Sequence, residues 1–288
     1  MAIKYLAGNR LWGTNAERLA LTTDSGYGIF NGSDQSLTSP SVSNFKFMSD
    51  GSPYSLAFWV YRNGSQSGTE PSYMGSNGTS TSDIGWALYC HNGSDGLGWF
   101  ISNGSAKLPP SELRTTLSDT TWTHIAVTYS TGDDYVRLYK DGTSVATYDA
   151  SGYSFSTSDP AYITAIGKNI GRGTHINARM ADIGFWEDHV LSTDDITKLA
   201  GGSPITDDGA GFDYSSANIV NHLPLSTNDD DTKGSLSFTD NGTVTYGTTG
   251  TPLDPSALPL LPNGALFEES DTGKHYMWDG SSTWNEVA

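Results

Sequence analysis

The sequence predicts an all-β fold, and three observations lead to this class. Glycine, serine, threonine and asparagine are abundant while only 16% of the residues are charged, which is typical of short strands joined by many turns. Hydrophobic residues make up 36% of the 288 residues, yet the chain contains 8 Trp, 15 Tyr and 10 Phe, so few large side chains can form a core. The clearest segments alternate apolar and polar residues with the period of a half-buried strand.

The first half of the chain predicts an opening strand, a central strand and a hairpin. Residues 28–34 predict a strand that runs into a turn, and residues 54–61 carry apolar and aromatic side chains on both faces, as expected at the centre of a sandwich. Residues 62–82 are rich in Gly, Ser, Thr and Asn and predict long loops. Residues 86–91 and 97–101 then predict a hairpin.

The second half predicts a three-strand meander followed by further strands. Residues 121–129 alternate most clearly, and we expect them to pair with residues 135–140. The chain then turns at Asp141-Gly142 into residues 144–148. This dipeptide favours a type I′ turn, because both central residues need a positive φ. Later strands are expected at residues 162–166, 180–186, 219–225 and 235–246.

One helix is expected, between Leu191 and Gly202. Ser192 is a suitable N-cap, Asp194 and Asp195 lie in the first turn, and Gly201 follows the end. The helix is therefore short, about two turns.

The two ends of the chain lie outside this pattern. Residues 1–23 predict an N-terminal docking arm with a short helix around residues 16–21, and repeated prolines predict a stiff linker over residues 251–264. Residues 265–288 predict a small C-terminal β-hairpin. A lone hairpin is marginal in water and needs a partner, so assembly contacts are expected at Tyr276, Trp278, Trp284 and Trp12.

The charge and the single cysteine exclude several functions. A formal net charge of −17 and a pI near 4.4 disfavour nucleic acid and anionic membrane surfaces as partners. Cys90 is the single cysteine of the sequence, so no disulfide can form within the chain, and we expect this residue in the core. No apolar run long enough for membrane insertion occurs, and the N-terminus lacks the pattern of a signal peptide. The plainest explanation of the acidity is that it keeps an exposed protein soluble.

The motifs just described form a recognisable series. The most specific part is Trp-Thr-His-Ile-Ala-Val-Thr-Tyr at residues 122–129, followed by Leu-Tyr-Lys-Asp-Gly at residues 138–142. Residues 30–34 and 55–60 match an opening turn and first central strand, and residues 181–186 match a closing strand before a capping helix. The series resembles the laminin-G-like, concanavalin A-like lectin superfamily.

This resemblance implies a two-sheet antiparallel jelly-roll sandwich of the concanavalin-like kind, with one short helix. It covers residues 24–202. One departure is that Leu223-Pro224-Leu225, which resembles a strand found earlier in many family members, comes after the helix. A strand from the far end can fill the same place in the sheet, because the two ends of a domain often lie close together. The laminin-G-like sandwich is therefore expected over residues 24–250.

The two end segments resemble those flanking virion-surface and tail-associated proteins of bacteriophages. This implies a non-enzymatic virion structural protein, either a capsid decoration protein or a tail or fibre appendage. We expect it at the virion surface, assembled from a signal-less chain made in the cytoplasm. The expected partners are other virion proteins or its own copies, with a trimer as one option, and cell-surface glycans. The alternatives are a free carbohydrate-binding lectin and, less favoured, a glycosidase.

The sequence contains no catalytic motif of the glycosidase kind. Glycosidases of this fold place their carboxylates at alternating positions of one strand, and no Glu-x-Asp-x-x-Glu run occurs. The six histidines form no His-x-His or His-x-x-x-His pair, so zinc is not expected.

Calcium is the expected cation, with a structural role. Hard cations take carboxylate and carbonyl oxygens, which the acidic turn at residues 229–231 can supply. The resemblance places Asp182 close to this turn, so the preferred ligands are Asp182 and Asp231, with Asp229. Asp34 and Asp50 are alternatives, and the competing interpretation is a solvated acidic loop.

Glycan contacts are expected on aromatic side chains near the edge of the sandwich. Sugars bind aromatic faces together with polar groups on loops. The candidates are Trp86, Tyr89 and Trp99 on the hairpin and Tyr73 in the long loop. The competing interpretation is that they belong to the core, where we also place Trp59, Trp122 and Trp186.

Overall fold

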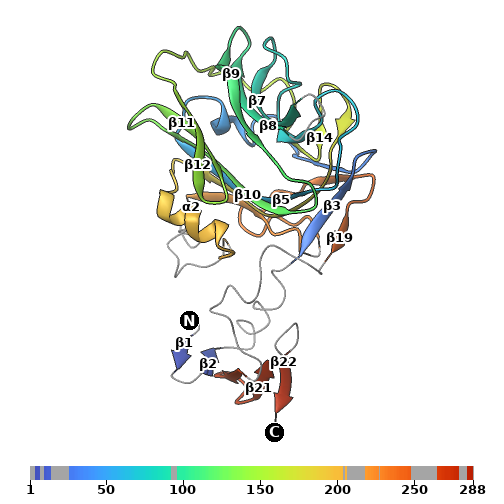
Figure 1. Ribbon diagram of the computed structural model, residues 1–288, viewed down its shortest axis with the longest axis vertical. Helices are drawn as coiled ribbons and strands as arrows, with labels where there is room; N and C mark the ends of the chain where they lie inside the picture. The colour runs from blue at the N-terminus through green and yellow to red at the C-terminus, as the bar shows by residue number, and fades with distance from the viewer. Residues whose placement is uncertain are drawn as a thin grey trace.

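The computed structural model describes two packed β-sheets, a smaller five-stranded sheet and a two-stranded pair (Figure 1). It describes residues 4–6, 10–13, 26–91, 96–203, 205, 218–226, 228–247, 265–278 and 284–287. The predicted all-β sandwich is confirmed, and α2 (Thr193–Ala200) is the one α-helix of these residues. Within the same residues, no helix is long and apolar enough to cross a membrane.

The first sheet contains the strands that alternate most clearly in the sequence. Its strands follow the order β12, β11, β10, β5, β16, β3 and β19, and β17 also pairs with β16. Asp141 and Gly142 both have positive φ, as the predicted type I′ turn requires. The bounds are β3 (Tyr27–Asn31), β5 (Tyr54–Arg62), β10 (Trp122–Ser130), β11 (Tyr135–Lys140), β12 (Thr143–Asp149), β16 (Asn177–Glu187), β17 (Ile219–Leu223) and β19 (Thr245–Gly247).

The second sheet contains three strands that the sequence did not reveal, namely β4, β6 and β9. β6 lies inside residues 62–82, which were expected to form loops, and β9 begins just before Pro109-Pro110, which hid its pattern. The order is β18, β4, β13, β6, β7, β8 and β9. The bounds are β4 (Ser36–Thr38), β6 (Ser72–Gly75), β7 (Ile84–His91), β8 (Gly96–Asn103), β9 (Lys107–Thr116), β13 (Ala165–Ile166) and β18 (Thr239–Asn241). Two short elements complete the sandwich: the pair β14 (Lys168–Asn169) and β15 (Thr174–His175), and the 3-10 turn η1 (Lys46–Met48).

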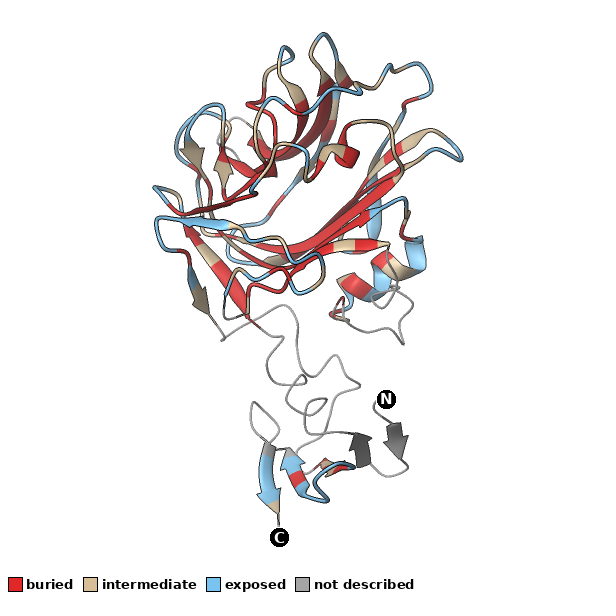
Figure 2. Cartoon of the chain, turned by 180° about the vertical axis from the view of Figure 1, so that it is seen from behind, coloured by how far each residue is buried: buried red, intermediate tan, exposed pale blue. Residues whose placement is uncertain are grey.

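The core lies between the two sheets and is built from large aromatic side chains. Figure 2 shows that buried residues run along the strands of both sheets. Trp86 and Trp99 of the second sheet contact each other with ring centroids 5.5 Å apart. They reach across to Phe185 and Tyr54 of the first sheet, with centroids 6.2 Å apart in both cases. Cys90 is buried in the same cluster, as predicted.

Helix α2 covers part of the outer side of the first sheet. Ile196 and Leu199 pack with Trp186 and Ala126 of the sheet. The predicted N-cap is confirmed: the Ser192 hydroxyl accepts from the Asp195 N–H at 3.2 Å, and the Asp195 carboxylate accepts from the Ser192 N–H at 3.0 Å.

The two ends of the chain form one sheet, which we call the terminal sheet. The predicted hairpin is present as β21 (His275–Trp278) and β22 (Trp284–Val287), but it is not alone. β2 (Arg10–Gly13) pairs in parallel with β20 (Leu266–Glu269), which brings the N-terminal arm into the same sheet. β1 (Lys4–Leu6) completes it.

The terminal sheet changes the role expected for Tyr276. Its side chain is only 8% exposed, so it serves the sheet's own packing and offers little surface to a partner. Trp278 and Trp284 lie opposite each other, and Trp12 lies opposite Glu268. The side chains of these three tryptophans, the helix expected at residues 16–21 and the linker at residues 251–264 fall outside the described parts of the chain.

Candidate functional site

An irregularity in β9 places a carboxylate on the outer side of the second sheet. Leu108 pairs with Ile101 and Leu113 pairs with Trp99, so residues 109–112 all lie opposite the single residue Phe100. Such a bulge redirects side chains. Glu112 ends this bulge with φ of 62°, in the left-handed region that a residue with a side chain seldom adopts.

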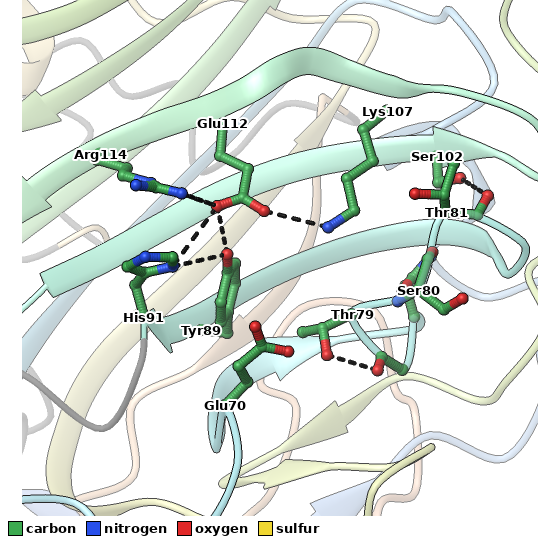
Figure 3. Close-up of polar contacts among 12 residues, drawn as sticks. Glu70, Thr79, Ser80, Thr81, Tyr89, His91, Ser102, Lys107, Glu112 and Arg114 are labelled. Atoms are coloured by element: carbon green, nitrogen blue, oxygen red, sulfur yellow. Dashed lines mark hydrogen bonds and ion pairs between the residues drawn. The ribbon is translucent and has the colours of Figure 1, made fainter.

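Four side chains surround the Glu112 carboxylate (Figure 3). The Tyr89 hydroxyl donates to Oε2, and Arg114 Nη2 donates to the same oxygen at 3.0 Å. Lys107 Nζ donates to Oε1 at 3.1 Å, and His91 Nδ1 lies 3.7 Å from Oε2. The Glu112 side chain is 8% exposed, whereas Arg114 is 49% exposed. We call these five residues the Glu112 site.

The surroundings keep Glu112 ionised. Burial on its own raises the pKa of the Glu112 carboxyl, but the hydrogen bonds from Tyr89, Lys107 and Arg114 outweigh it, and the pKa lies below its ordinary value. Burial, followed by the hydrogen bond to Glu112, raises the pKa of the Tyr89 hydroxyl. Glu112 is therefore a fixed hydrogen-bond acceptor at neutral pH and holds no proton for general acid catalysis.

A second polar group borders the site on the same side of the sheet. Glu70 forms an ion pair with Arg172 at 3.1 Å, and Arg172 Nε donates to the Thr79 hydroxyl at 2.6 Å. Figure 3 shows Glu70 and Thr79 beside Tyr89. Charged groups from β7, from β9 and from the segments around Glu70 and Arg172 are thus held in place by contacts with polar neighbours.

Three of the four predicted glycan contacts are wrong. Tyr73, Trp86 and Trp99 are fully buried between the sheets, so no ring face is open to a ligand. Tyr89 does lie on the outer side of the sheet, but its ring is also buried and only its hydroxyl takes part in the Glu112 site.

Sequence reasoning missed the charged members of the site. His91 lies two residues after Tyr89, and Arg114 lies two residues after Glu112, so each pair shares one face of its strand. That spacing was the available signal. The two prolines at Pro109-Pro110 interrupt the alternation of this strand and mask that signal.

The proposed calcium ligands do not fit a cation. Asp182 Oδ1 lies 2.7 Å from His222 Nε2, and Asp182 Oδ2 accepts from the Ile205 N–H at 3.1 Å. Both oxygens of Asp231 face N–H donors, namely those of His222, Lys233 and Gly234 at Oδ1, and those of Asn221 and Leu236 at Oδ2. These donors occupy the positions that calcium would need.

The remaining acidic candidates, Asp229, Asp34 and Asp50, do not form a metal-binding cluster within the described residues. Within the described residues, no group of three or more His, Cys, Asp or Glu side chains is placed to hold a metal, so Asp229 does not complete a site. Asp34 and Asp50 each accept a local hydrogen bond, from Asn31 and Ser52. The prediction of Asp182, Asp231 and Asp229 as metal ligands is corrected to a structural role for Asp182 and Asp231.

Replacing Asp231 by Ala is expected to lower the free energy of unfolding by about 3 kcal/mol, because buried N–H groups lose their acceptor. Thermal unfolding should show the same loss in calcium and in a chelator. Asp229→Ala, in the same turn, is the control and should change stability by less than about 0.5 kcal/mol. A calcium-dependent stabilisation that disappears in Asp231→Ala would restore the metal interpretation.

The fold and the polar outer site define a β-sandwich of the lectin-like class. The chain belongs to the concanavalin A-like lectin/glucanases superfamily, whose sequence profile matches residues 31–197. No curated protein matches the chain.

The solved structures that resemble the chain have low sequence identity to it. A Bacteroides ovatus protein classed as carbohydrate-binding is 17% identical, with a TM-score of 0.55 over 80% of this chain and 62% of that one. The chain therefore spans about three fifths of that protein's length. A heptameric SAP-like pentraxin from Limulus polyphemus is 13% identical, with a TM-score of 0.49 over 78% of this chain and 95% of that one.

Proposed function

We propose that this chain is a non-enzymatic glycan-binding protein, and that the Glu112 site contacts the glycan. The supporting observation is the fixed Glu112 carboxylate, with Lys107, Arg114 and His91 around it on an outer sheet face. Sugar hydroxyls both donate and accept hydrogen bonds, so they match a surface that offers an acceptor beside several donors.

Two properties of the site favour binding over hydrolysis. The mutual hydrogen bonds hold the side chains in place before a ligand arrives, which reduces the ordering cost of binding. Glycoside hydrolysis needs one protonated carboxyl beside an ionised one. The lowered pKa of Glu112 makes it unsuited to the first role.

A glycan array with the full chain tests the proposal. Arg114→Gln removes an exposed donor with little cost to folding, and Glu112→Gln removes the central acceptor. Both are expected to reduce binding at least about tenfold, a loss of about 1.4 kcal/mol per lost contact. Asp133→Asn, which breaks the exposed ion pair with Arg137, is the matched control and should bind like the unmodified chain. Unchanged binding by Arg114→Gln and a folded Glu112→Gln would refute the site.

We further propose that the sandwich is displayed on a virion surface and attached through the terminal sheet. What supports this is the parallel pairing of β2 with β20, which joins both ends of the chain in one unit whose strands pair with neither sheet of the sandwich. Such a unit suits attachment to a particle or to further copies of the chain.

The attachment role can be tested by mass in solution. The full chain is expected to associate, whereas a chain without residues 1–23 and 252–288 is expected to be monomeric. Equal monomeric masses would contradict the attachment role, but they would leave the glycan site untouched.

A further inference from the structure

The outer face of the first sheet carries a row of partly exposed side chains that belongs to neither the core nor the Glu112 site. Trp122, Tyr61, Arg179 and Ile29 lie directly opposite one another on β10, β5, β16 and β3. Each is partly buried. With Tyr27, which is 5% exposed, these residues form what we call the Arg179 face.

Aromatic rings hold the Arg179 guanidinium. Its carbon lies 4.6 Å from the ring centroid of Tyr61 and 5.1 Å from that of Tyr27. The Trp122 ring meets both tyrosines edge-on, with centroids 5.5 Å apart in each case. A cation over aromatic faces is stabilised without losing its hydrogen-bond donors.

Among the arginines whose side chains the structure describes, Arg179 is the one without a carboxylate partner. Among the described side chains, its one hydrogen bond is from Nη1 to the Tyr27 hydroxyl, at 3.3 Å, and no carboxylate pairs with it. This is unexpected in a chain with 32 acidic and 15 basic residues. The other four arginines with described side chains all have carboxylate partners, in the pairs Arg62–Asp119, Arg114–Glu112, Arg137–Asp133 and Arg172–Glu70.

We propose that the Arg179 face is a second binding site, for a sugar residue that carries a carboxylate. The guanidinium would pair with the carboxylate through parallel N–H bonds, a geometry that arginine provides and lysine does not. The Tyr61 and Trp122 rings would contact the apolar face of the sugar ring.

The neighbouring residues and the overall charge limit the class of ligand that this face can bind. Asn177 lies two residues before Arg179 on the same face of β16, and its Oδ1 accepts from Asn63 Nδ2 at 3.2 Å, so amide groups border the face. The net charge of −17 repels polyanions such as nucleic acid. A single carboxylate on an otherwise neutral ring meets less repulsion and is therefore favoured.

Calorimetric titration of the full chain with glucuronic acid and with its methyl ester tests the proposal. The ester keeps the ring and removes the charge. The acid is expected to bind at least about tenfold more tightly than the ester, since a charge-assisted pair is lost. Arg179→Gln should abolish this preference, and Arg179→Lys should weaken binding of the acid.

Controls separate this site from the Glu112 site. Arg137→Gln, at an arginine of the same sheet that has a carboxylate partner, should bind glucuronic acid like the unmodified chain. Equal binding of acid and ester, or no binding of the acid by the unmodified chain, would overturn the proposal even if Arg179→Gln did not fold. A loss caused by Arg114→Gln but not by Arg179→Gln would overturn the Arg179 face and leave the proposed function standing.

Discussion

Replacing Trp99 by Ala is expected to lower the free energy of unfolding by about 3–5 kcal/mol, the usual cost of truncating a fully buried aromatic side chain. Trp99 is completely buried and its ring contacts those of Trp86 and Tyr54, so the truncation leaves a cavity at the centre of the core. Urea denaturation followed by circular dichroism measures the loss, provided that the slope with urea stays constant.

Trp122 supplies the matched control for this prediction. It lies on the outer side of the first sheet and is only partly buried, against Tyr27 and Tyr61. Trp122→Ala is expected to cost about 1–2 kcal/mol, because less apolar area returns to water. If Trp99→Ala cost less than Trp122→Ala, Trp99 would not be the core residue described above.

Strands with clear alternation could be predicted from the sequence, because the period reflects burial on one face. Residues 121–129 and 135–140 became β10 and β11 in the expected antiparallel pair. β9 could not be predicted in the same way. Its residues 109–112 leave the ladder opposite Phe100, and this bulge breaks the period at the point where Glu112 enters the site.

Contacts between segments that lie far apart in the sequence could not be predicted either. β2 and β20 are separated by almost the whole chain, and nothing local in either segment specifies their parallel pairing. The Glu112 site also depends on contacts between separate segments. Its residues come from β7 and β9, which lie on either side of β8, and their side chains meet on one face of the second sheet. Single-strand patterns predict which face a residue occupies, but not its neighbours across the sheet.

The acidic candidates show how a correct placement can support a wrong role. Asp182 and Asp231 do come together, since both contact His222, one at its ring and the other at its backbone N–H. Carboxylates at this spacing suggest a cation as their counter-charge. Here the imidazole and a set of N–H groups stabilise them instead, and those groups come from residues without a metal-binding pattern.

Acid is expected to destabilise the protein through His124, beginning well above the range in which carboxylates titrate. Burial lowers the pKa of His124 to about 3, and Nδ1 has no hydrogen-bond partner among the described residues. In the unfolded chain the histidine pKa is about 6.5. The folded state therefore binds fewer protons than the unfolded state between these two values. Stability is complete above about pH 6.5 and falls by about 1.4 kcal/mol per pH unit down to about pH 3, a total of about 5 kcal/mol.

His124→Phe isolates this effect, because phenylalanine keeps an aromatic ring against Trp59, whose centroid lies 5.2 Å away, and cannot take up a proton. Urea unfolding between about pH 6.5 and 5 should show a loss of about 2 kcal/mol in the unmodified chain that the variant lacks. His275→Phe, at an exposed histidine of the terminal sheet, should keep the loss. Equal pH slopes for the unmodified chain and His124→Phe would mean that His124 titrates normally.

Below about pH 4.3, protonation of Glu112 adds to the loss of stability. Because the pKa of Glu112 is lowered in the folded state, its contribution to stability disappears as the pH falls through the folded-state pKa. The loss of stability between about pH 6.5 and 4.3 therefore reports on His124, which lies on β10 of the first sheet. The loss below about pH 4.3 also includes the candidate glycan site on the second sheet.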